Sequence, residues 1–268
     1  MSDVRAVVLD WAGTAVDHGC CAPVGAFIEV FRKEGVTVSR AQARAPMGTG
    51  KREHIRRMTA DPDVADAWIA ARGSPPMDGD VDRMFGALAS VAMTALAAHA
   101  TPIPGVLDAV EALRARGIRV GSCTGYTREM LDVVQAAAAE HGYRPDVAVA
   151  ATEVPEGRPA PFLPWEVARR LGVWPAKAVV VAGDTAPDVL SARNAGMWAV
   201  GVAATGNGVG LMADELAALS AAALEARVSP VRSALYGAGA HLVIDSIAEL
   251  PAAVSWVEAQ LAAGRSPS

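Results

Sequence analysis

The sequence predicts an α/β fold, a doubly wound, mostly parallel Rossmann-like sheet with an inserted all-helical cap domain. Six short apolar segments, rich in β-branched and small residues, mostly alternate with helix-like stretches, a pattern typical of strands that helices cover on both faces. The interval 23–99 instead has helical spacing and no convincing strand. With 268 residues, 52% of them hydrophobic, the chain can form one large domain or a domain with a smaller one inserted.

The predicted strands are short, and helix-like stretches separate most of them. The fourth is apolar throughout its centre, as expected for a strand buried on both faces. In chain order the strands are VRAVVLD (4–10), GIRVGSCT (117–124), DVAVAA (146–151), AVVVAGD (178–184), WAVGV (198–202) and HLVID (241–245). Helices are predicted at 105–116, 127–141, 162–171, 187–195 and 213–226.

The interval between the first two strands is too long for an ordinary crossover connection. Segments within it, such as KREHIRRM (51–58) and VDRMFGALASVAMTALAAHA (81–100), have apolar residues at helical spacing. We therefore predict a helical cap domain at 21–100, inserted into a catalytic core formed by 1–20 and 101–268. The segment TPIPG (101–105) is the predicted return hinge.

Composition and charge exclude several functions. The formal net charge of −5 argues against general binding to nucleic acid or to an anionic membrane surface. We find no apolar run close to the roughly 20 residues of a membrane helix, and the N-terminus lacks the layout of a signal peptide. The three cysteines form no CxxC pair, which favours reduced thiols. A cytoplasmic protein is the expectation.

Polar residues follow four successive predicted strands, at the edge where α/β sheets bind ligands. Asp10 follows the first strand, Thr124 ends the second, Arg158 comes after the third, and Asp184 ends the fourth, with Asp188 four residues later. The aspartates form an oxygen-ligand group that suits Mg²⁺. Thr124, the adjacent Gly125 and Arg158 offer donors for phosphate oxygens. Each residue alone could be a helix cap or turn residue, but the set favours phosphoryl chemistry.

A family resemblance rests on these motifs. The segments LDWAGT, SCTGY, GRP and AGDTAPDVLSARNAGMW resemble the motifs of the haloacid dehalogenase superfamily of phosphoryl-transfer enzymes. The resemblance covers nearly the whole chain and implies a nucleophilic aspartate at Asp10. It also implies Mg²⁺ held by Asp10, the Ala12 carbonyl and Asp184, with Asp188 beside them.

Within that superfamily, DWAGTAVDHGCCAP, APMGTGKREHIRRM and VPEGRPAP resemble the phosphonoacetaldehyde hydrolase family. That family carries alanine where related phosphatases carry a second aspartate, and Ala12 stands there. It also carries a Schiff-base lysine in the cap, after Pro-Met-Gly, and Lys51 matches it. Met47, Cys20 and Tyr126 are candidate pocket residues. His54, three residues after Lys51 and on the same helical face, is a candidate catalytic group.

The resemblance implies hydrolysis of phosphonoacetaldehyde to acetaldehyde and phosphate, in the degradation of 2-aminoethylphosphonate, by a cytoplasmic homodimer. It also implies a Schiff base on Lys51 and an aspartyl phosphate on Asp10. The alternative is a Mg²⁺-dependent phosphatase or phosphomutase of the same superfamily acting on a small phosphate ester. Ala12 argues against it, because an oxygen leaving group needs a proton donor near that position. A haloacid dehalogenase and a non-catalytic phosphate-binding regulator are the more distant alternatives.

Overall fold

The computed structural model describes residues 4–267 and contains a parallel six-stranded sheet in the order β3-β2-β1-β4-β5-β6. Its six strands lie where the sequence predicts strands. They are β1 (Ala6–Leu9), β2 (Arg119–Thr124), β3 (Val147–Ala150), β4 (Val179–Gly183), β5 (Trp198–Val202) and β6 (Leu242–Ile244). The predicted α/β fold class is confirmed, and all five described strand pairings are parallel.

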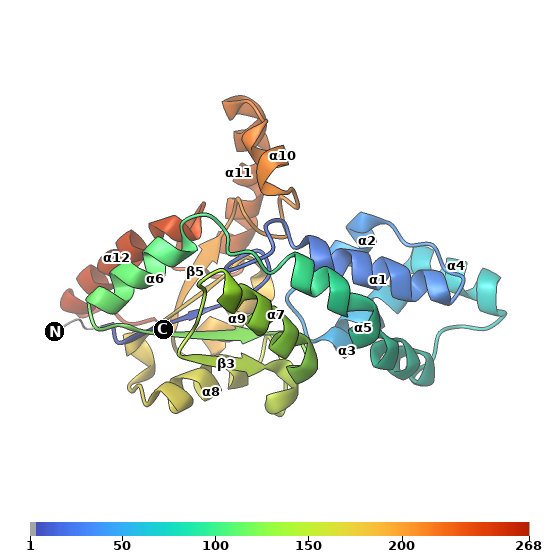
Figure 1. Cartoon of the computed structure of the whole chain (residues 1–268), viewed down its shortest axis with the longest axis horizontal. Coiled ribbons are helices and arrows are strands. Elements are labelled where there is room, and N and C mark those ends of the chain that lie inside the picture. The colour runs from blue at the N-terminus through green and yellow to red at the C-terminus, as the bar shows by residue number, and fades with distance from the viewer. Residues whose placement is uncertain (1–3, 268) are drawn as a thin grey trace.

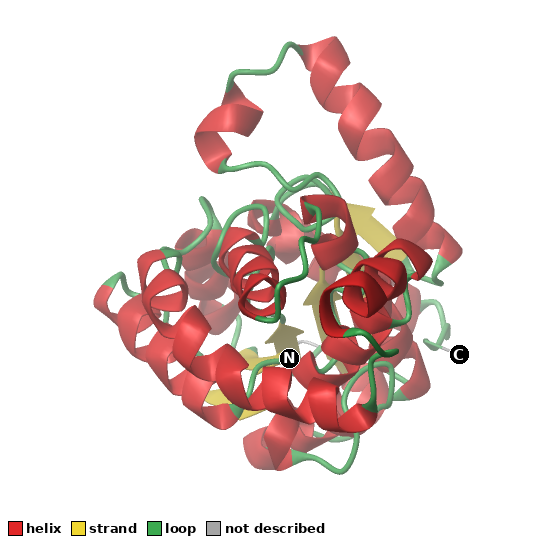
Figure 2. Ribbon diagram, turned by 90° about the vertical axis from the view of Figure 1, so that its right-hand side faces the viewer, coloured by secondary structure: helices red, strands yellow, loops and turns green. Residues whose placement is uncertain are grey.

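Helices cover both faces of the sheet (Figures 1 and 2). One face packs against α6 (Val106–Ala115), α7 (Arg128–Glu140) and α12 (Leu250–Ala262). The other packs against α8 (Phe162–Leu171), α9 (Ala186–Asn194) and α11 (Ala221–Gly237). Alternate residues of β1 enter the two cores: Val7 and Leu9 enter one, and Ala6 and Val8 enter the other. This alternation explains why the strand is apolar at every position.

Six helices lie between β1 and β2, and the first five extend to one side of the sheet, at the right of Figure 1. These five are α1 (Cys21–Lys33), α2 (Arg40–Arg44), α3 (Lys51–Thr59), α4 (Pro62–Arg72) and α5 (Asp78–Ala98). Helix α5 packs along α1 and also contacts α7 of the core. We call residues 21–100 the cap; its status as a separate domain stays a prediction.

Two expectations need correction. The segment 213–226, predicted as one helix, instead forms α10 (Ala213–Ala217) and the start of α11. Helix α10 ends with Ala218 as its C-cap, and the Ser220 hydroxyl then caps the N-terminus of α11. Helix α5, of 21 residues, is long and apolar enough to cross a membrane by length and composition alone. Its buried residues recur every three or four positions, which is the stripe of a helix packed on one side.

Short 3-10 helices complete the chain at Ala151–Glu153, Ala176–Ala178 and Ile247–Glu249. The register aligns the carboxyl ends of the central strands: Leu9 pairs with Ser122 of β2 and with Ala182 of β4. The strand order reverses between β1 and β4, the crevice where doubly wound sheets bind ligands. The residues that follow these strands therefore meet at one edge, facing the cap.

Candidate active site

Asp10 lies at the centre of this edge, directly after β1, where the chain turns sharply. The Trp11 carbonyl accepts hydrogen bonds from the backbone N–H groups of Ala15 and Val16. Gly13 has φ +85°, and a Cβ there would lie 2.6 Å from Asp184 Oδ2. The tight turn and its glycine therefore let a second carboxylate approach the first.

Three buried carboxylates form a cluster. Oxygens of Asp10, Asp184 and Asp188 all lie within 4.8 Å of one another. Asp184 accepts hydrogen bonds from the Asn207 backbone N–H at 2.7 Å and the Thr14 hydroxyl at 3.3 Å. Burial, and then the charges of Asp10 and Asp188, raise the pKa of Asp184. Three carboxyl groups buried so close together stay ionised only where positive charge lies near them.

Arg158 supplies part of that charge. Its Nη1 lies 2.8 Å from Asp10 Oδ1 and 2.8 Å from Asp188 Oδ1, and its Nη2 donates to the Cys123 carbonyl at 3.0 Å. Asp188 also accepts from the Thr185 backbone and hydroxyl at the start of α9. Asp188 therefore both caps a helix and holds the guanidinium. A phosphate oxygen can reach Arg158 only by sharing it with these carboxylates.

The turn after β2 lies opposite. The Thr124 hydroxyl accepts a hydrogen bond from the Tyr126 N–H at 3.2 Å, and Thr124, Gly125 and Tyr126 all line the same small cavity as Asp10 and Arg158. A Cβ on Gly125 would lie 2.7 Å from the Thr49 carbonyl of the cap. Gly125 therefore lets the cap loop rest on this turn.

Lys51, the first residue of α3, brings an amine from the cap into this cavity. Its side chain is buried, and Nζ lies 4.9 Å from the Tyr126 ring centroid and 5.4 Å from that of Phe27. Burial lowers the pKa of Lys51 to about 8, although the Asp10 charge acts in the opposite direction. The positive end of the α3 dipole also disfavours an ammonium there.

The cap is closed over the core. The cavity that holds the site encloses only about 20 Å³, room for about one water molecule. Met47 and Gly48 of the cap and Ala12 of the core also line it. Cys20, whose thiol donates to the Ala12 carbonyl at 3.1 Å and to Asp184 Oδ2 at 3.4 Å, completes the wall; burial holds the pKa of Cys20 well above its usual value.

The chain is similar to several known proteins. A model of the haloacid dehalogenase-like hydrolase family matches residues 4–196. A phosphonoacetaldehyde hydrolase from Nitratidesulfovibrio vulgaris is 48% identical over 264 residues, covering 98% of this chain and 94% of that protein. One from Bacillus cytotoxicus is 41% identical over 257 residues, covering 96% and 97%. A solved phosphonoacetaldehyde hydrolase-like protein from Oleispira antarctica has a TM-score of 0.97 at 40% identity, covering 99% and 96%.

The chain belongs to the phosphonoacetaldehyde hydrolase family, among the haloacid dehalogenase-like hydrolases.

Hydrolases of the haloacid dehalogenase-like family generally use Mg²⁺, and the acid cluster fits that ion. The donor set is all oxygen, as Mg²⁺ prefers. Burial raises the pKa values of Asp184 and Asp188, and the Asp10 charge raises both further. Asp10, Asp184 and the Ala12 carbonyl would hold the ion, with Asp188 beside it.

His54 is placed differently from the other candidates. Its ring stacks on Phe27 with centroids 3.7 Å apart, and Nε2 donates to the Ala43 carbonyl at 2.9 Å. Among the described residues Nδ1 has no hydrogen-bond partner. Burial lowers the pKa of His54 well below its usual value, so the ring is neutral. His54 is not one of the cavity-lining residues; it supports Phe27, on which the Lys51 amine rests.

Several residues that support the site were not among the candidates predicted from the sequence. Thr14 and Asn207 hold Asp184, and Phe27 contacts Lys51. Asn207 acts through its backbone N–H, which any residue but proline carries, so no pattern of residue types could identify it. In the sequence, Phe27 is indistinguishable from the other apolar residues of a cap helix. Only Thr14, four residues after Asp10, lies within a recognised motif.

Proposed function

We propose that this hydrolase cleaves the carbon–phosphorus bond of phosphonoacetaldehyde, giving acetaldehyde and phosphate. The observation that carries the proposal is the buried Lys51 amine, with a pKa of about 8, in one cavity with Asp10 and Ala12. An aldehyde needs an amine to form an imine, and a phosphoryl group needs a nucleophile. Ala12 leaves no acid at the position where an oxygen leaving group would be protonated. The names of the relatives support the same substrate.

The first chemical step belongs to Lys51. Its neutral amine attacks the aldehyde carbon, and loss of water gives a protonated imine. That cation lies one carbon away from the carbon bonded to phosphorus. The imine can therefore accept the electron pair of the carbon–phosphorus bond when the bond breaks. The alternative leaving group, a bare carbanion, is avoided.

Asp10 forms the new bond to phosphorus. Its carboxylate oxygen attacks as the carbon–phosphorus pair moves into the imine, which leaves an enamine on Lys51 and a phosphoryl group on Asp10. Arg158, Thr124 and the Gly125 N–H are placed to bind the phosphoryl oxygens. When bound, Mg²⁺ supplies positive charge against the carboxylates and the phosphoryl group. Attack by Asp10 requires that Arg158 move some of its contact from carboxylate to phosphoryl oxygen.

Two hydrolyses complete the cycle. The enamine carbon takes up a proton and the resulting imine is hydrolysed, releasing acetaldehyde and the Lys51 amine. Water attacks the phosphoryl group and releases phosphate from Asp10. The nitrogen of Lys51 lies in the cavity and is the preferred group to activate this water, whereas His54 lies behind Phe27.

The closing test is trapping on the lysine. Borohydride reduces an imine, so substrate plus borohydride should inactivate the enzyme and attach the two-carbon unit to Lys51. The chain has only three lysines, Lys33, Lys51 and Lys177, so peptide mass spectrometry locates the label unambiguously. Lys51→Arg should abolish acetaldehyde release, because a guanidinium forms no imine, and the exposed Lys177→Arg is the matched control. A label on another lysine, or no inactivation, contradicts the Schiff base.

The aspartyl phosphate has its own test. Asp10→Asn should remove turnover while leaving substrate able to label Lys51, because the imine forms before Asp10 attacks. Substantial phosphate release by this variant would show that Asp10 is not the nucleophile. A panel of sugar phosphates tested alongside decides between this chemistry and the phosphatase or phosphomutase alternative.

We also propose a cytoplasmic homodimer that joins through cap helices and acts in 2-aminoethylphosphonate degradation, on a small phosphonate and not on nucleic acid or membranes. The net charge of −5 argues against binding to nucleic acid or an anionic membrane. The partly exposed α5 offers a cap surface for the dimer contact. Light scattering after size exclusion should give twice the 27.5 kDa chain mass; a monomer at micromolar concentration contradicts the dimer.

A further inference from the structure

Arg44, at the end of α2, reaches from the cap to two separate segments of the core. Its Nη1 donates to the Gly19 carbonyl at 2.6 Å and to Asn207 Oδ1 at 3.1 Å. Its Nη2 donates to the Gly210 carbonyl at 3.1 Å. One planar guanidinium therefore ties the cap both to the chain that leads into α1 and to the loop 205–211 after β5. Arg44 does not line the catalytic cavity.

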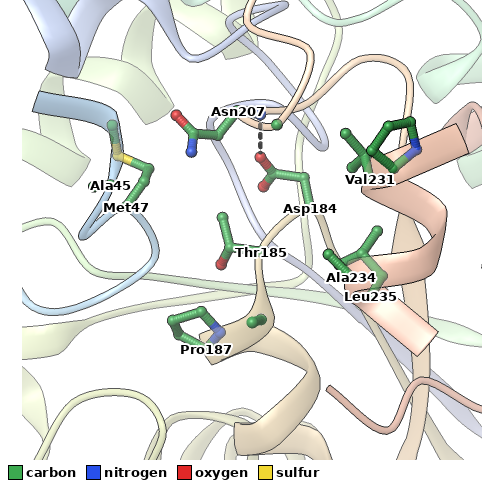
Figure 3. Close-up of a pocket in the computed structure, with 12 residues that line it drawn as sticks. Ala45, Met47, Asp184, Thr185, Pro187, Asn207, Val231, Ala234 and Leu235 are labelled. Carbon is green, nitrogen blue, oxygen red and sulfur yellow. Dashed lines mark hydrogen bonds between the residues drawn. The ribbon is translucent and has the colours of Figure 1, made fainter. Parts of the chain in front are cut away.

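Asn207 completes a reciprocal pair and extends it to the acid cluster. Its side-chain amide donates to the Arg44 carbonyl at 3.2 Å, so each residue both gives and receives a hydrogen bond. Its backbone N–H donates to Asp184 Oδ2 at 2.7 Å, the dashed line in Figure 3. A continuous chain of hydrogen bonds thus runs from the cap, through Asn207, to a carboxylate of the proposed metal site.

The surrounding backbone is shaped for this contact. Gly210 has φ +68°, and a Cβ there would lie 2.9 Å from the guanidinium carbon of Arg44. A Cβ on Gly206 would lie 2.6 Å from Asp184 Oδ2. Two glycines of one loop therefore make room for Arg44 on one side and Asp184 on the other. A side chain at either position would push the loop away from its partner.

We propose that Arg44 is a positioning residue, which with Asn207 fixes the loop 45–50 over the core and so aligns Lys51 with Asp10. Arg44 directly precedes this loop, which carries Met47 and ends at Gly50, just before Lys51. Ala45 and Met47 face Asp184 and Asn207 across a pocket of about 300 Å³ (Figure 3). Because Met47 and Asp184 line both this pocket and the small catalytic cavity, loss of the Arg44–Asn207 pair opens the cavity to the larger space.

The pair acts on alignment and not on phosphonate binding. Arg158 and Thr124, the proposed phosphoryl contacts, belong to the core and have no contact with Arg44 among the interactions described. Loss of the pair should therefore lower kcat by about 10- to 100-fold, since small displacements of reacting groups have effects of that size. KM should stay within about threefold of wild type. A merely structural loss of stability would not produce this split.

Hydrogen–deuterium exchange tests the proposal without substrate. In Arg44→Gln, amide exchange in peptides covering 45–50 and 205–211 should accelerate by about tenfold, the factor carried by hydrogen bonds to a charged group. Arg40→Gln is the matched control: it removes the same charge from the same helix, at an exposed position, and should leave both peptides unchanged. Acceleration limited to 45–50, or equal in both variants, overturns the coupling.

A double-mutant cycle provides the second arm. Asn207→Ala removes its side-chain bonds to Arg44 but keeps the backbone N–H to Asp184. It should lower kcat in the same direction as Arg44→Gln, which also loses the bonds to Gly19 and Gly210. The double variant should lose less than the sum of the two single losses, because the bond from the Arg44 guanidinium to Asn207 Oδ1 is lost in all three. If Arg44→Gln does not fold, Arg44→Lys and Asn207→Ala form the cycle. Additive losses overturn the pair.

The turnover readout rests on the proposed function, whereas the exchange readout does not. If the wild type released no acetaldehyde yet Arg44→Gln accelerated exchange in both peptides, the proposed function would fail and the positioning role would stand. If the wild type were active and exchange in Arg44→Gln matched wild type, the positioning role would fail and the proposed function would stand.

Discussion

Gly48 offers the sharpest test of whether the closed cap is the working conformation. It lies in the cap loop with φ +91°, and a Cβ there would lie 2.9 Å from Thr185 Cβ and 3.2 Å from Pro187 Cγ of the core, and closer still to the Thr185 hydroxyl. Thr185 cannot simply rotate away, because its hydroxyl donates to Asp188 Oδ2. Gly48→Ala therefore forces the loop off the core or breaks a bond to the acid cluster.

Two effects contribute to the loss of activity expected for Gly48→Ala. A non-glycine residue in the left-handed region costs about 1–2 kcal/mol, which lowers the closed population about 5- to 30-fold relative to open forms. Relieving the contact with Thr185 requires a further displacement, and a shift of about 1 Å in reacting groups costs about 100-fold in rate. We expect kcat/KM for phosphonoacetaldehyde to fall by about 100-fold or more, with a much smaller change in thermal stability.

Gly50→Ala is the matched control, two residues along the same loop. Gly50 has φ −58° and ψ 145°, which alanine adopts freely, and no described atom lies within 4 Å of the added Cβ. Loss of a good helix N-cap costs about 1 kcal/mol of stability at most, and turnover should stay within about threefold of wild type.

The assay couples acetaldehyde release to NADH oxidation and follows both variants with wild type. If Gly48→Ala retained a third or more of wild-type kcat/KM, the closed arrangement would not be the catalytic one. The same conclusion would follow if Gly50→Ala lost as much activity as Gly48→Ala.

Three further predictions concern pH and Mg²⁺. With a pKa of about 8, about a tenth of Lys51 is neutral at pH 7 and half at pH 8. The rate of borohydride trapping should therefore rise with a midpoint near pH 8 and level off above about pH 9; a midpoint near 10.5 contradicts burial as the cause. Mg²⁺ at about 100 times its Kd should stabilise the chain by about 2.7 kcal/mol and raise Tm by about 5–10 °C, whereas Asp184→Asn should show little rise; an equal rise in both contradicts the metal site. The Asp17 hydrogen bond raises the pKa of His99, so this pair stabilises the fold fully below about pH 6.5 and loses its effect as pH rises through the higher folded pKa; urea unfolding of wild type and His99→Gln should differ more at pH 5.5 than at pH 9, and a constant difference contradicts the linkage.

Much of the fold could be predicted because its signals are local. Each strand of the sheet is a short apolar run that ends in a turn, and each neighbouring helix has its own spacing and cap. The segment 213–226 was the exception, since Ser220 fits both a helix interior and a helix N-cap in an alanine-rich stretch. Helix α5 shows the opposite limit: length and composition alone do not separate a packed cap helix from a membrane helix.

The sequence by itself determined which chemistry-bearing residues stand after the strands, because parallel strands bring their carboxyl ends to one edge. It also determined that the chain has both an alanine at position 12 and a lysine at position 51, the combination that favours carbon–phosphorus cleavage. Only the tertiary structure decided that Arg158 bridges Asp10 and Asp188 and that His54 turns to Phe27. It alone decided that Arg44 meets Asn207. These contacts join segments that are far apart in the chain. Local spacing cannot predict them, because the packing of the closed cap and of the loop after β5 decides which groups meet.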